Sequence, residues 1–373
     1  MNILIFSWRG LGHPRAGGAE MVTHQHAKAW VKAGHSVTLF TSSYQGAEPE
    51  EIIDGVRIKR KGSQYLVVHI LAFFWYLFQD QRFDLVIDHF HGLPFFTPLF
   101  IRVKKLAFIH EVAKELWFLN PLPWPLNWII GITGYLGEPF IFMLYKGTSF
   151  MTGAKSTKND LIALGIPESN ITIISHGVTV SKSSLKLKAK KPTITYFGVL
   201  SKDKGIEDAL RCFSILNTQG DFDFWIIGRP ETWRYMNKLN KMIKELNLVG
   251  KIKMWGFVPE DLKFQLLAKS HLLINPSVRE GWGLVVLEGS AMGTPTIGYN
   301  VSGLRDSIMD KQTGILCRNN TPQDLSSNVT LLLSRKTYFN TMRLNAIKWS
   351  RSFSWEKSIN KSIKLINQIE KMF

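Results

Sequence analysis

The stretch from Asn275 to Gly298 constrains the fold of this 373-residue chain more than any other part. An apolar run over 272–274 predicts a short buried strand directly before it. The turn Gly281-Trp282-Gly283 opens a predicted helix that ends near Met292, and Pro295 begins the next strand. A strand, loop, helix and strand in this order predict a parallel α/β sheet. Ligands of such sheets bind at the carboxyl ends of the strands.

Two carboxylates fall in this unit, Glu280 in the loop and Glu288 a little over one turn into the helix. Glu288 has apolar and small neighbours, so its burial is costly unless a partner hydrogen-bonds it. A helix N-terminus preceded by glycines also offers free amide N–H groups to a phosphate. Together these features indicate a sugar-nucleotide site. The alternative is a surface loop and an amphipathic helix with an ordinary glutamate.

The spacing Glu280-x7-Glu288 lies within Pro276-Ser-Val-Arg-Glu-Gly-Trp-Gly-Leu284 and precedes Gly293-Thr-Pro-Thr-Ile297. This pattern resembles the signature of family 4 retaining glycosyltransferases (glycosyl transferases group 1, GT-B superfamily). The resemblance implies an α/β GT-B fold, with two Rossmann-like parallel-sheet domains facing across a cleft. It also implies a C-terminal helix that crosses back to the N-terminal domain.

The chain length fits two α/β domains. We expect an acceptor-side domain over residues 1–178 and a nucleotide-sugar-binding domain over 193–352. The polar, basic stretch 179–192 has no buried pattern and is the predicted linker. An amphipathic helix over 353–373 is expected to pack back on the N-terminal domain.

The glycine-rich segment near the N-terminus narrows the class of enzyme. Gly10-x-Gly12-x-x-Arg15 lacks the third glycine of a dinucleotide fingerprint, and the next strand ends without an acidic residue. A nicotinamide-dependent oxidoreductase is therefore disfavoured. Gly17-Gly18-Ala-Glu resembles the loop in which paired glycines of the family let the backbone approach the donor phosphates. Glycines needed only for a tight turn are the alternative, above all at Gly10 and Gly12.

Several histidines end predicted strands. His110 resembles the family histidine that lies beside the donor sugar. His89 and His91 alternate along an extended chain, so we expect them on opposite faces and not on a shared metal. Asp221 and Asp223 precede a strand at the amino end of the sheet and are rejected as a metal site. We expect no metal and no cofactor other than the donor substrate.

The loop Gly198-Val199 to Lys204-Gly205 resembles the family loop whose arginine and lysine neutralise the donor pyrophosphate. Lys204 matches the lysine, but Val199 stands where relatives usually have the arginine. Arg229 or Arg279 could replace the missing cation. If neither does, transfer would be slow or absent.

The resemblance assigns roles to these residues. His110 would orient the donor sugar, Lys204 would stabilise the leaving phosphate, and Glu280 would hold sugar hydroxyls. Glu288 would hold the ribose. Transfer by front-face attack, assisted by the leaving phosphate, requires no protein nucleophile. The expected catalytic residues are His110, Lys204 and Glu280, and the expected donor-binding residues are Gly17, Gly18, Lys204, Arg229, Arg279, Glu280, Gly281, Trp282, Gly283, Leu284 and Glu288.

The segment 116–145 is rich in tryptophan, tyrosine and proline. Tryptophan and tyrosine favour the membrane–water interface, so this segment predicts peripheral membrane contact. The alternative is an irregular connection packed on the domain. The longest apolar runs, 66–78 and 92–101, are shorter than the roughly 20 residues that span a bilayer. With Cys212 and Cys317 as its only cysteines, the chain suits a reducing compartment. We expect a cytoplasmic protein at the inner face of the cell membrane.

The net charge of +17 suits anionic partners. No recognised nucleic-acid-binding module accompanies it, so nucleic acid is not an expected partner. The resulting hypothesis is a metal-independent, retaining hexosyltransferase. It would move a sugar from a nucleotide diphosphate donor to a lipid-linked or polysaccharide acceptor. Two alternatives remain, a GT-B sugar-nucleotide epimerase and a catalytically silent protein that binds nucleotide sugars or polyanions.

Overall fold

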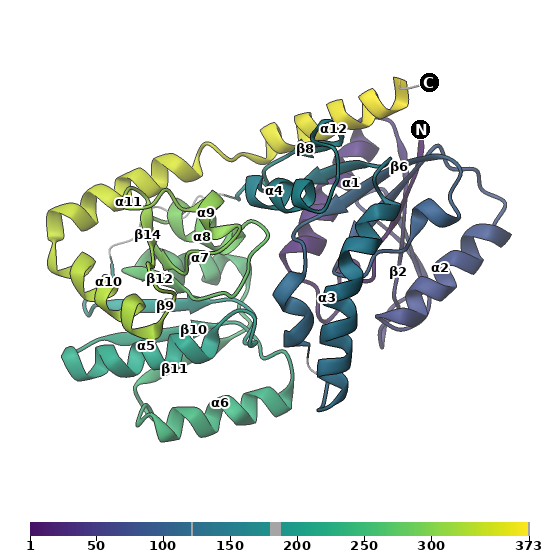
Figure 1. Ribbon diagram of the computed structural model, residues 1–373. Helices are drawn as coiled ribbons and strands as arrows, with labels where there is room; N and C mark the ends of the chain where they lie inside the picture. Colours follow the sequence, from purple (N-terminus) through teal and green to yellow (C-terminus); the bar gives the residue numbers. More distant parts are fainter. Residues whose placement is uncertain (121, 180–187, 372–373) are drawn as a thin grey trace. The chain divides into compact units, whose positions relative to one another are not determined.

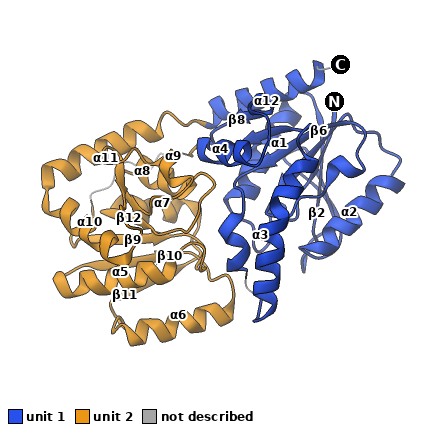
Figure 2. Cartoon of the chain, viewed as in Figure 1, with its two compact units in different colours: residues 1–176, 355–373 blue, residues 177–354 orange. Residues whose placement is uncertain are grey.

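The computed structural model describes residues 1–120, 122–179 and 188–371. Within these residues the chain forms two compact units, shown in Figures 1 and 2. Unit 1 comprises residues 1–176 and the C-terminal segment from Trp355, and unit 2 comprises residues 177–354. Most of the predicted linker, residues 180–187, lies outside the described residues.

Unit 1 is built on an eight-stranded sheet in the order β3-β4-β2-β1-β5-β6-β7-β8. All neighbouring strands are parallel except β3, which is antiparallel to β4. Central strands such as β1 are almost wholly apolar and buried, as expected where helices cover both faces of a sheet. The strands are β1 (Asn2–Phe6), β2 (Ser36–Thr41), β3 (Glu50–Ile53), β4 (Val56–Arg60), β5 (Leu85–Phe90), β6 (Lys104–Ile109), β7 (Ser149–Thr152) and β8 (Ile171–Ile173).

The helices of unit 1 include one from the far end of the sequence. The C-terminal helix packs against the first helix, where Trp30 Nε1 donates a hydrogen bond to Ser362 Oγ at 3.2 Å (Figure 1). The return of the terminal helix to the first unit is thus confirmed. The helices are α1 (Gly18–Lys32), α2 (Leu66–Phe78), α3 (Leu126–Leu144), α4 (Lys155–Ala163) and α12 (Trp355–Lys371), with 3₁₀ turns η1 (Thr97–Leu99), η2 (Lys114–Leu119) and η3 (Glu168–Asn170).

Unit 2 contains a six-stranded, all-parallel sheet in the order β11-β10-β9-β12-β13-β14. The strands are β9 (Thr193–Phe197), β10 (Asp223–Ile227), β11 (Ile252–Gly256), β12 (Leu272–Asn275), β13 (Thr296–Gly298) and β14 (Gly314–Leu316). Strand order reverses between β9 and β12, so the loops at their carboxyl ends border the expected ligand crevice.

The helices of unit 2 cover this sheet (Figure 1). They are α5 (Ile206–Gln219), α6 (Trp233–Glu245), α7 (Glu260–Lys269), α8 (Leu284–Ala291), α9 (Leu304–Ser307), α10 (Pro322–Ser334) and α11 (Lys336–Ser350). Helix α8 follows β12 after the glycine turn 281–283 and lies within the central stretch 275–298. The predicted strand–loop–helix–strand unit is therefore present. The two α/β domains with mainly parallel sheets, which the fold prediction requires, are present as well.

Candidate active site

Two loops meet at the point in unit 2 where the strand order reverses. Val278 N–H donates a hydrogen bond to Asp203 O at 2.8 Å, which joins the β12–α8 loop to the β9–α5 loop. Gly205 has φ +71°, and a Cβ there would lie 2.0 Å from Pro276 O. Only glycine fits this approach without moving the backbone. The lysine of one loop and the glutamate of the other are thereby brought together.

Lys204 and Glu280 form an ion pair across these loops. Lys204 Nζ lies 3.2 Å from Glu280 Oε1, and the two side chains are 26% and 15% exposed. Ser277 Oγ lies 2.9 Å from the same carboxylate oxygen. The structure thus places two of the three predicted catalytic residues side by side at the carboxyl edge of the sheet.

The turn before α8 presents backbone at the same edge. Gly283 is the N-cap residue of α8 with φ +75°, and Leu284 begins the helix. The first amide N–H groups of a helix have no intrahelical acceptor. Trp282 is buried, with its ring 5.2 Å from that of Phe353. Its side chain belongs to the core, so Gly281 to Leu284 offer mainly backbone to a ligand.

Glu288 faces a partner that the sequence analysis missed. Lys263 Nζ on α7 lies 2.7 Å from Glu288 Oε1, and the Glu288 side chain is 12% exposed. Burial raises the pKa of Glu288, while the Lys263 charge and its hydrogen bond act in the opposite direction. Lys263 stands on a separate helix and in no recognised motif, so only the spatial contact reveals it.

The two arginines proposed as substitutes differ in their surroundings. Arg279 is buried beside Glu280. Arg229 O accepts a hydrogen bond from Leu200 N–H at 2.9 Å, so its backbone pairs with the loop that carries Val199. Its guanidinium lies 5.6 Å from the centroid of the Phe257 ring. Both arginines thus stand on segments that pair with the loop 198–205, Arg229 through Leu200 and Arg279 through the adjacent Val278.

In unit 1, Gly17 and Gly18 stand at the start of α1, beyond the carboxyl end of β1. Gly17 N–H donates a hydrogen bond to Glu20 Oε2 at 2.7 Å. Arg9 Nε in turn lies 2.8 Å from Glu20 Oε1. The buried Glu20 carboxylate therefore fixes the glycine turn and an adjacent cation at one edge of the sheet.

His110 follows β6 at the carboxyl edge of the same sheet, and its Nε2 lies 2.8 Å from His89 Nε2. Ser7 Oγ donates to the Arg9 carbonyl, so it accepts from His89 Nδ1 at 2.8 Å. Thr23 Oγ1 also lies 3.1 Å from His89 Nε2, so this nitrogen is shared between Thr23 and His110. Burial lowers the pKa of His110 to about 4, so the ring is neutral at pH 7.

The expectation that His89 and His91 point to opposite faces is wrong. Their ring centroids lie 4.3 Å apart. Side chains of an extended chain alternate with a period of two, so residues i and i+2 lie on the same face and the premise of the expectation was incorrect. Among the described residues, no group of histidine, cysteine, aspartate and glutamate is arranged to hold a metal ion.

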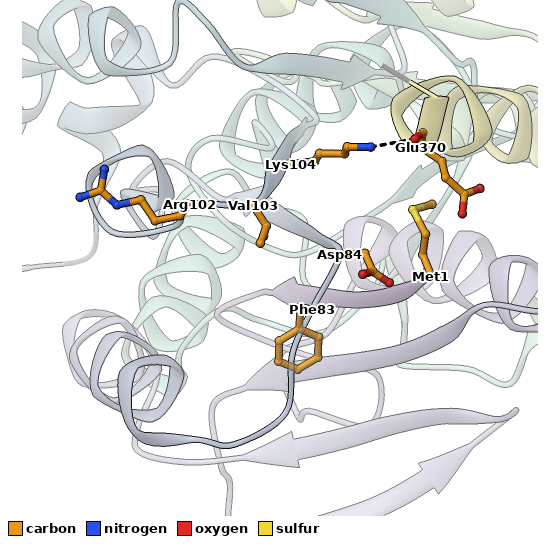
Figure 3. A pocket seen from close by; sticks show the side chains of 7 residues that line it. All are labelled: Met1, Phe83, Asp84, Arg102, Val103, Lys104 and Glu370. Atoms are coloured by element: carbon orange, nitrogen blue, oxygen red, sulfur yellow. Dashed lines mark hydrogen bonds between the residues drawn. The ribbon is translucent and has the colours of Figure 1, made fainter. Parts of the chain in front are cut away.

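A cavity of about 540 Å³ lies at the opposite edge of the unit 1 sheet (Figure 3). Asp84 immediately precedes β5 and Lys104 begins β6, which places the cavity at the amino ends of these strands. Lys104 Nζ donates a hydrogen bond to Glu370 O at 2.7 Å. Ligands of parallel sheets bind at the other edge, so this cavity is separate from the candidate site.

Solved structures similar to this chain include glycosyltransferases of the GT-B fold. Sucrose-phosphate synthase from Thermosynechococcus elongatus has a TM-score of 0.81 at 16% identity, over 99% of this chain and 98% of its own. WaaG, a glycosyltransferase of lipopolysaccharide biosynthesis, has a TM-score of 0.77 at 14% identity, over 98% and 99%. Anabaena HepE, solved with UDP and glucose, has a TM-score of 0.73 at 16% identity, over 98% and 99%.

Sequence comparison identifies the family. The model for Glycosyltransferase Family 4 matches residues 16–182, and the model for Glycosyl transferases group 1 matches residues 178–349. An uncharacterised glycosyltransferase of Methanocaldococcus jannaschii is 22% identical over 97% of both chains. A second one from that organism is 28% identical over 164 residues, which is 44% of each chain. The chain belongs to the group 1 glycosyltransferases.

Proposed function

We propose that this protein is a retaining hexosyltransferase that takes its sugar from a nucleotide diphosphate donor bound to unit 2, without a metal ion. The observation that carries the proposal is the Lys204–Glu280 pair, held by glycine contacts where the strand order of the sheet reverses. A cation at this edge suits a phosphate, and a carboxylate suits sugar hydroxyls. The complexes of Anabaena HepE with UDP-glucose and with UDP support a nucleotide sugar as donor.

Each side chain has a role in the proposed reaction. Lys204 would stabilise negative charge as the sugar–phosphate bond breaks. Glu280 would accept hydrogen bonds from sugar hydroxyls, and Glu288 from the ribose. The leaving phosphate would take the proton of the acceptor hydroxyl as it attacks from the same face. His110, neutral at pH 7, would orient the sugar by hydrogen bonding.

The acceptor is proposed to be a lipid-linked or polysaccharide glycan reached at a membrane surface, through the acceptor-side unit 1. Helix α3 supports this proposal because large apolar side chains on it are exposed, including Trp128 at 54% and Phe140 at 68%. Trp124, just before the helix, is 80% exposed. Exposed apolar surface with tryptophans suits a membrane interface. The proposed location is the cytoplasmic face of the cell membrane.

No helix among the described residues combines the length and apolar character needed to cross a bilayer. We propose a peripheral membrane contact in which the exposed apolar side chains of α3 lie in the interface.

The proposal is tested by transfer assays across a panel of nucleotide diphosphate sugars, with membrane lipid extract as acceptor. Turnover with one donor, and its loss in Glu280→Ala and Lys204→Ala, is the expected result. Retention is then read from the anomeric configuration of the product by NMR. Full activity in both variants would contradict the proposed site. Donor binding without turnover would favour the silent binding protein, for which the exposed Val199 in the phosphate loop is the specific observation.

A further inference from the structure

Lys263 and Glu288 form an enclosed charge pair in unit 2. Lys263 Nζ lies 2.7 Å from Glu288 Oε1, and the side chains are only 15% and 12% exposed. The rings of Phe264 and Phe197 lie 4.5 and 5.8 Å from the same nitrogen. Glu260 Oε1 also lies 3.8 Å from this nitrogen, but its side chain is 64% exposed. Moving Lys263 away would leave the buried Glu288 carboxylate uncompensated, so the pair keeps a fixed geometry.

The contact engages one carboxylate oxygen. In the part of the chain that the structure describes, Lys263 is the hydrogen-bond partner of Glu288, through Oε1. Burial favours the protonated acid at Glu288, and Lys263 opposes this by stabilising the carboxylate. Lys263 thus holds an ionised acceptor in one orientation and leaves Oε2 for another donor.

We propose that Lys263 is a positioning residue that aims Glu288 Oε2 at the ribose hydroxyls of the bound nucleotide. The inference rests on the proposed function, which places the ribose at Glu288. Lys263 acts through the carboxylate and does not touch the phosphates. The pair therefore determines how strongly the site prefers a ribonucleotide to one that lacks the ribose hydroxyls.

A purely structural pair makes a different prediction. If Lys263 only stabilised unit 2, its loss would weaken all nucleotides equally or weaken none. A positioning role changes the ratio of the affinities for a nucleotide with and without ribose hydroxyls. This ratio is the readout that separates the two roles.

Calorimetry of the full chain measures this ratio. UDP, GDP and ADP are titrated into the wild type, and the tightest of them is compared with its 2′,3′-dideoxy counterpart. The variants are Lys263→Met, Lys263→Arg, Glu288→Gln and the Lys263→Met/Glu288→Gln double variant. Lys241→Met, which removes an exposed lysine 3.7 Å from Glu245 in the same unit, is the matched control. Thermal melts check folding, and Lys263→Gln replaces Lys263→Met if the latter does not fold.

Lys263→Met is expected to weaken the ribonucleotide about tenfold, the size of a lost charged hydrogen bond, with the dideoxy nucleotide changed less than about twofold. Lys263→Arg keeps most of the affinity, and Lys263→Met has no further effect in the Glu288→Gln background. Equal weakening of both nucleotides, or an unchanged ratio, overturns the positioning role. A wild type that binds no nucleoside diphosphate overturns the proposed function and this inference together.

Discussion

At the residue scale, Val199 and Arg229 determine the positive charge near Lys204 in the proposed phosphate site. Val199 is 40% exposed in the loop that carries Lys204. The loop pairs with the backbone of Arg229, because Leu200 N–H donates to Arg229 O and Glu231 N–H donates to Leu200 O. Arg229, in the loop after β10, therefore pairs through its backbone with the residue after Val199, the position where the family has its arginine. We propose that Arg229 supplies part of the missing charge.

Val199→Arg should strengthen donor binding, because a second guanidinium would reach the pyrophosphate region from the same loop. We expect the KM for the donor to fall by about three- to tenfold, the size of one charge-assisted hydrogen bond at a partly exposed site. Steady-state kinetics with the active donor provide the measurement. Val249→Arg adds the same charge at an exposed position after α6 and serves as control. An equal gain in both variants would mean that net charge, and not position, is responsible.

Tyr196 holds the two ends of the same loop. Its buried hydroxyl donates to Val199 O at 2.8 Å and lies 3.3 Å from Lys204 O. Tyr196→Phe keeps the ring but removes the donor, so it should lower the free energy of unfolding by about 1–2 kcal/mol. It should also raise the donor KM, because Lys204 loses its support. Urea unfolding and donor kinetics test the two effects, and a stability loss with an unchanged KM would contradict the link to Lys204.

At the scale of elements, helix α3 packs its glycines against the rest of unit 1 and exposes many of its large apolar side chains. A Cβ on Gly131 would lie 2.5 Å from the Phe118 ring, and one on Gly134 would lie 2.3 Å from the Trp117 ring. The glycines therefore form the face that packs on η2. Glu138 joins α3 to the start of η2, because its carboxylate accepts hydrogen bonds from Ala113 N–H and Lys114 N–H at 2.8 and 2.9 Å. Many large apolar residues, including Trp128, Leu136 and Phe140, are left exposed, while Phe142 is buried.

This exposed face should bind membranes. Replacing Trp128, Leu136 and Phe140 together with serine should weaken vesicle binding at least about tenfold, since each buried large apolar side chain contributes roughly 1.5–3 kcal/mol. Co-sedimentation with vesicles of phosphatidylcholine and phosphatidylglycerol measures the effect. Val249→Ser/Leu344→Ser removes exposed apolar residues from unit 2 and should leave binding unchanged. Equal binding by wild type and the triple variant would exclude α3 as the membrane contact.

At the scale of the whole molecule, local sequence patterns predicted the strands and the helix after the glycine turn. Features that depend on contacts between distant residues could not be predicted in this way. The run 272–274 and the glycine turn after it sufficed to place Glu280 and α8, because a parallel strand and a helix start have strong local patterns. The segment 126–144 contains glycines and a proline that locally disfavour a helix, so its helix depends on packing against η2. Lys263 could not be linked to Glu288, because nothing in the sequence brings α7 beside α8.

Histidines buried in unit 1 predict how the molecule responds to acid. His26 is fully buried on α1, and its Nδ1 lies 2.9 Å from Ser362 Oγ on α12, so it joins the two ends of the chain. Burial is the main cause that lowers its pKa to about 3, and burial also lowers the pKa values of His89 and His176. These rings are therefore neutral in the folded protein at pH 7.

The sign of the effect follows from the unfolded state, in which histidine has a pKa of about 6.5. As the pH falls below that value, the unfolded chain takes up protons that the folded chain does not. Each buried histidine then lowers the free energy of unfolding by about 1.4 kcal/mol per pH unit until its folded pKa is reached, about 3 for His26. Above pH 6.5 these groups leave stability unchanged.

Urea unfolding followed by circular dichroism between about pH 7.5 and 4.5 should therefore show a steep loss of the free energy of unfolding below pH 6.5. His26→Gln should have a shallower slope than the wild type. Equal slopes for His26→Gln and the wild type would show that the junction of α1 and α12 does not contribute to acid sensitivity.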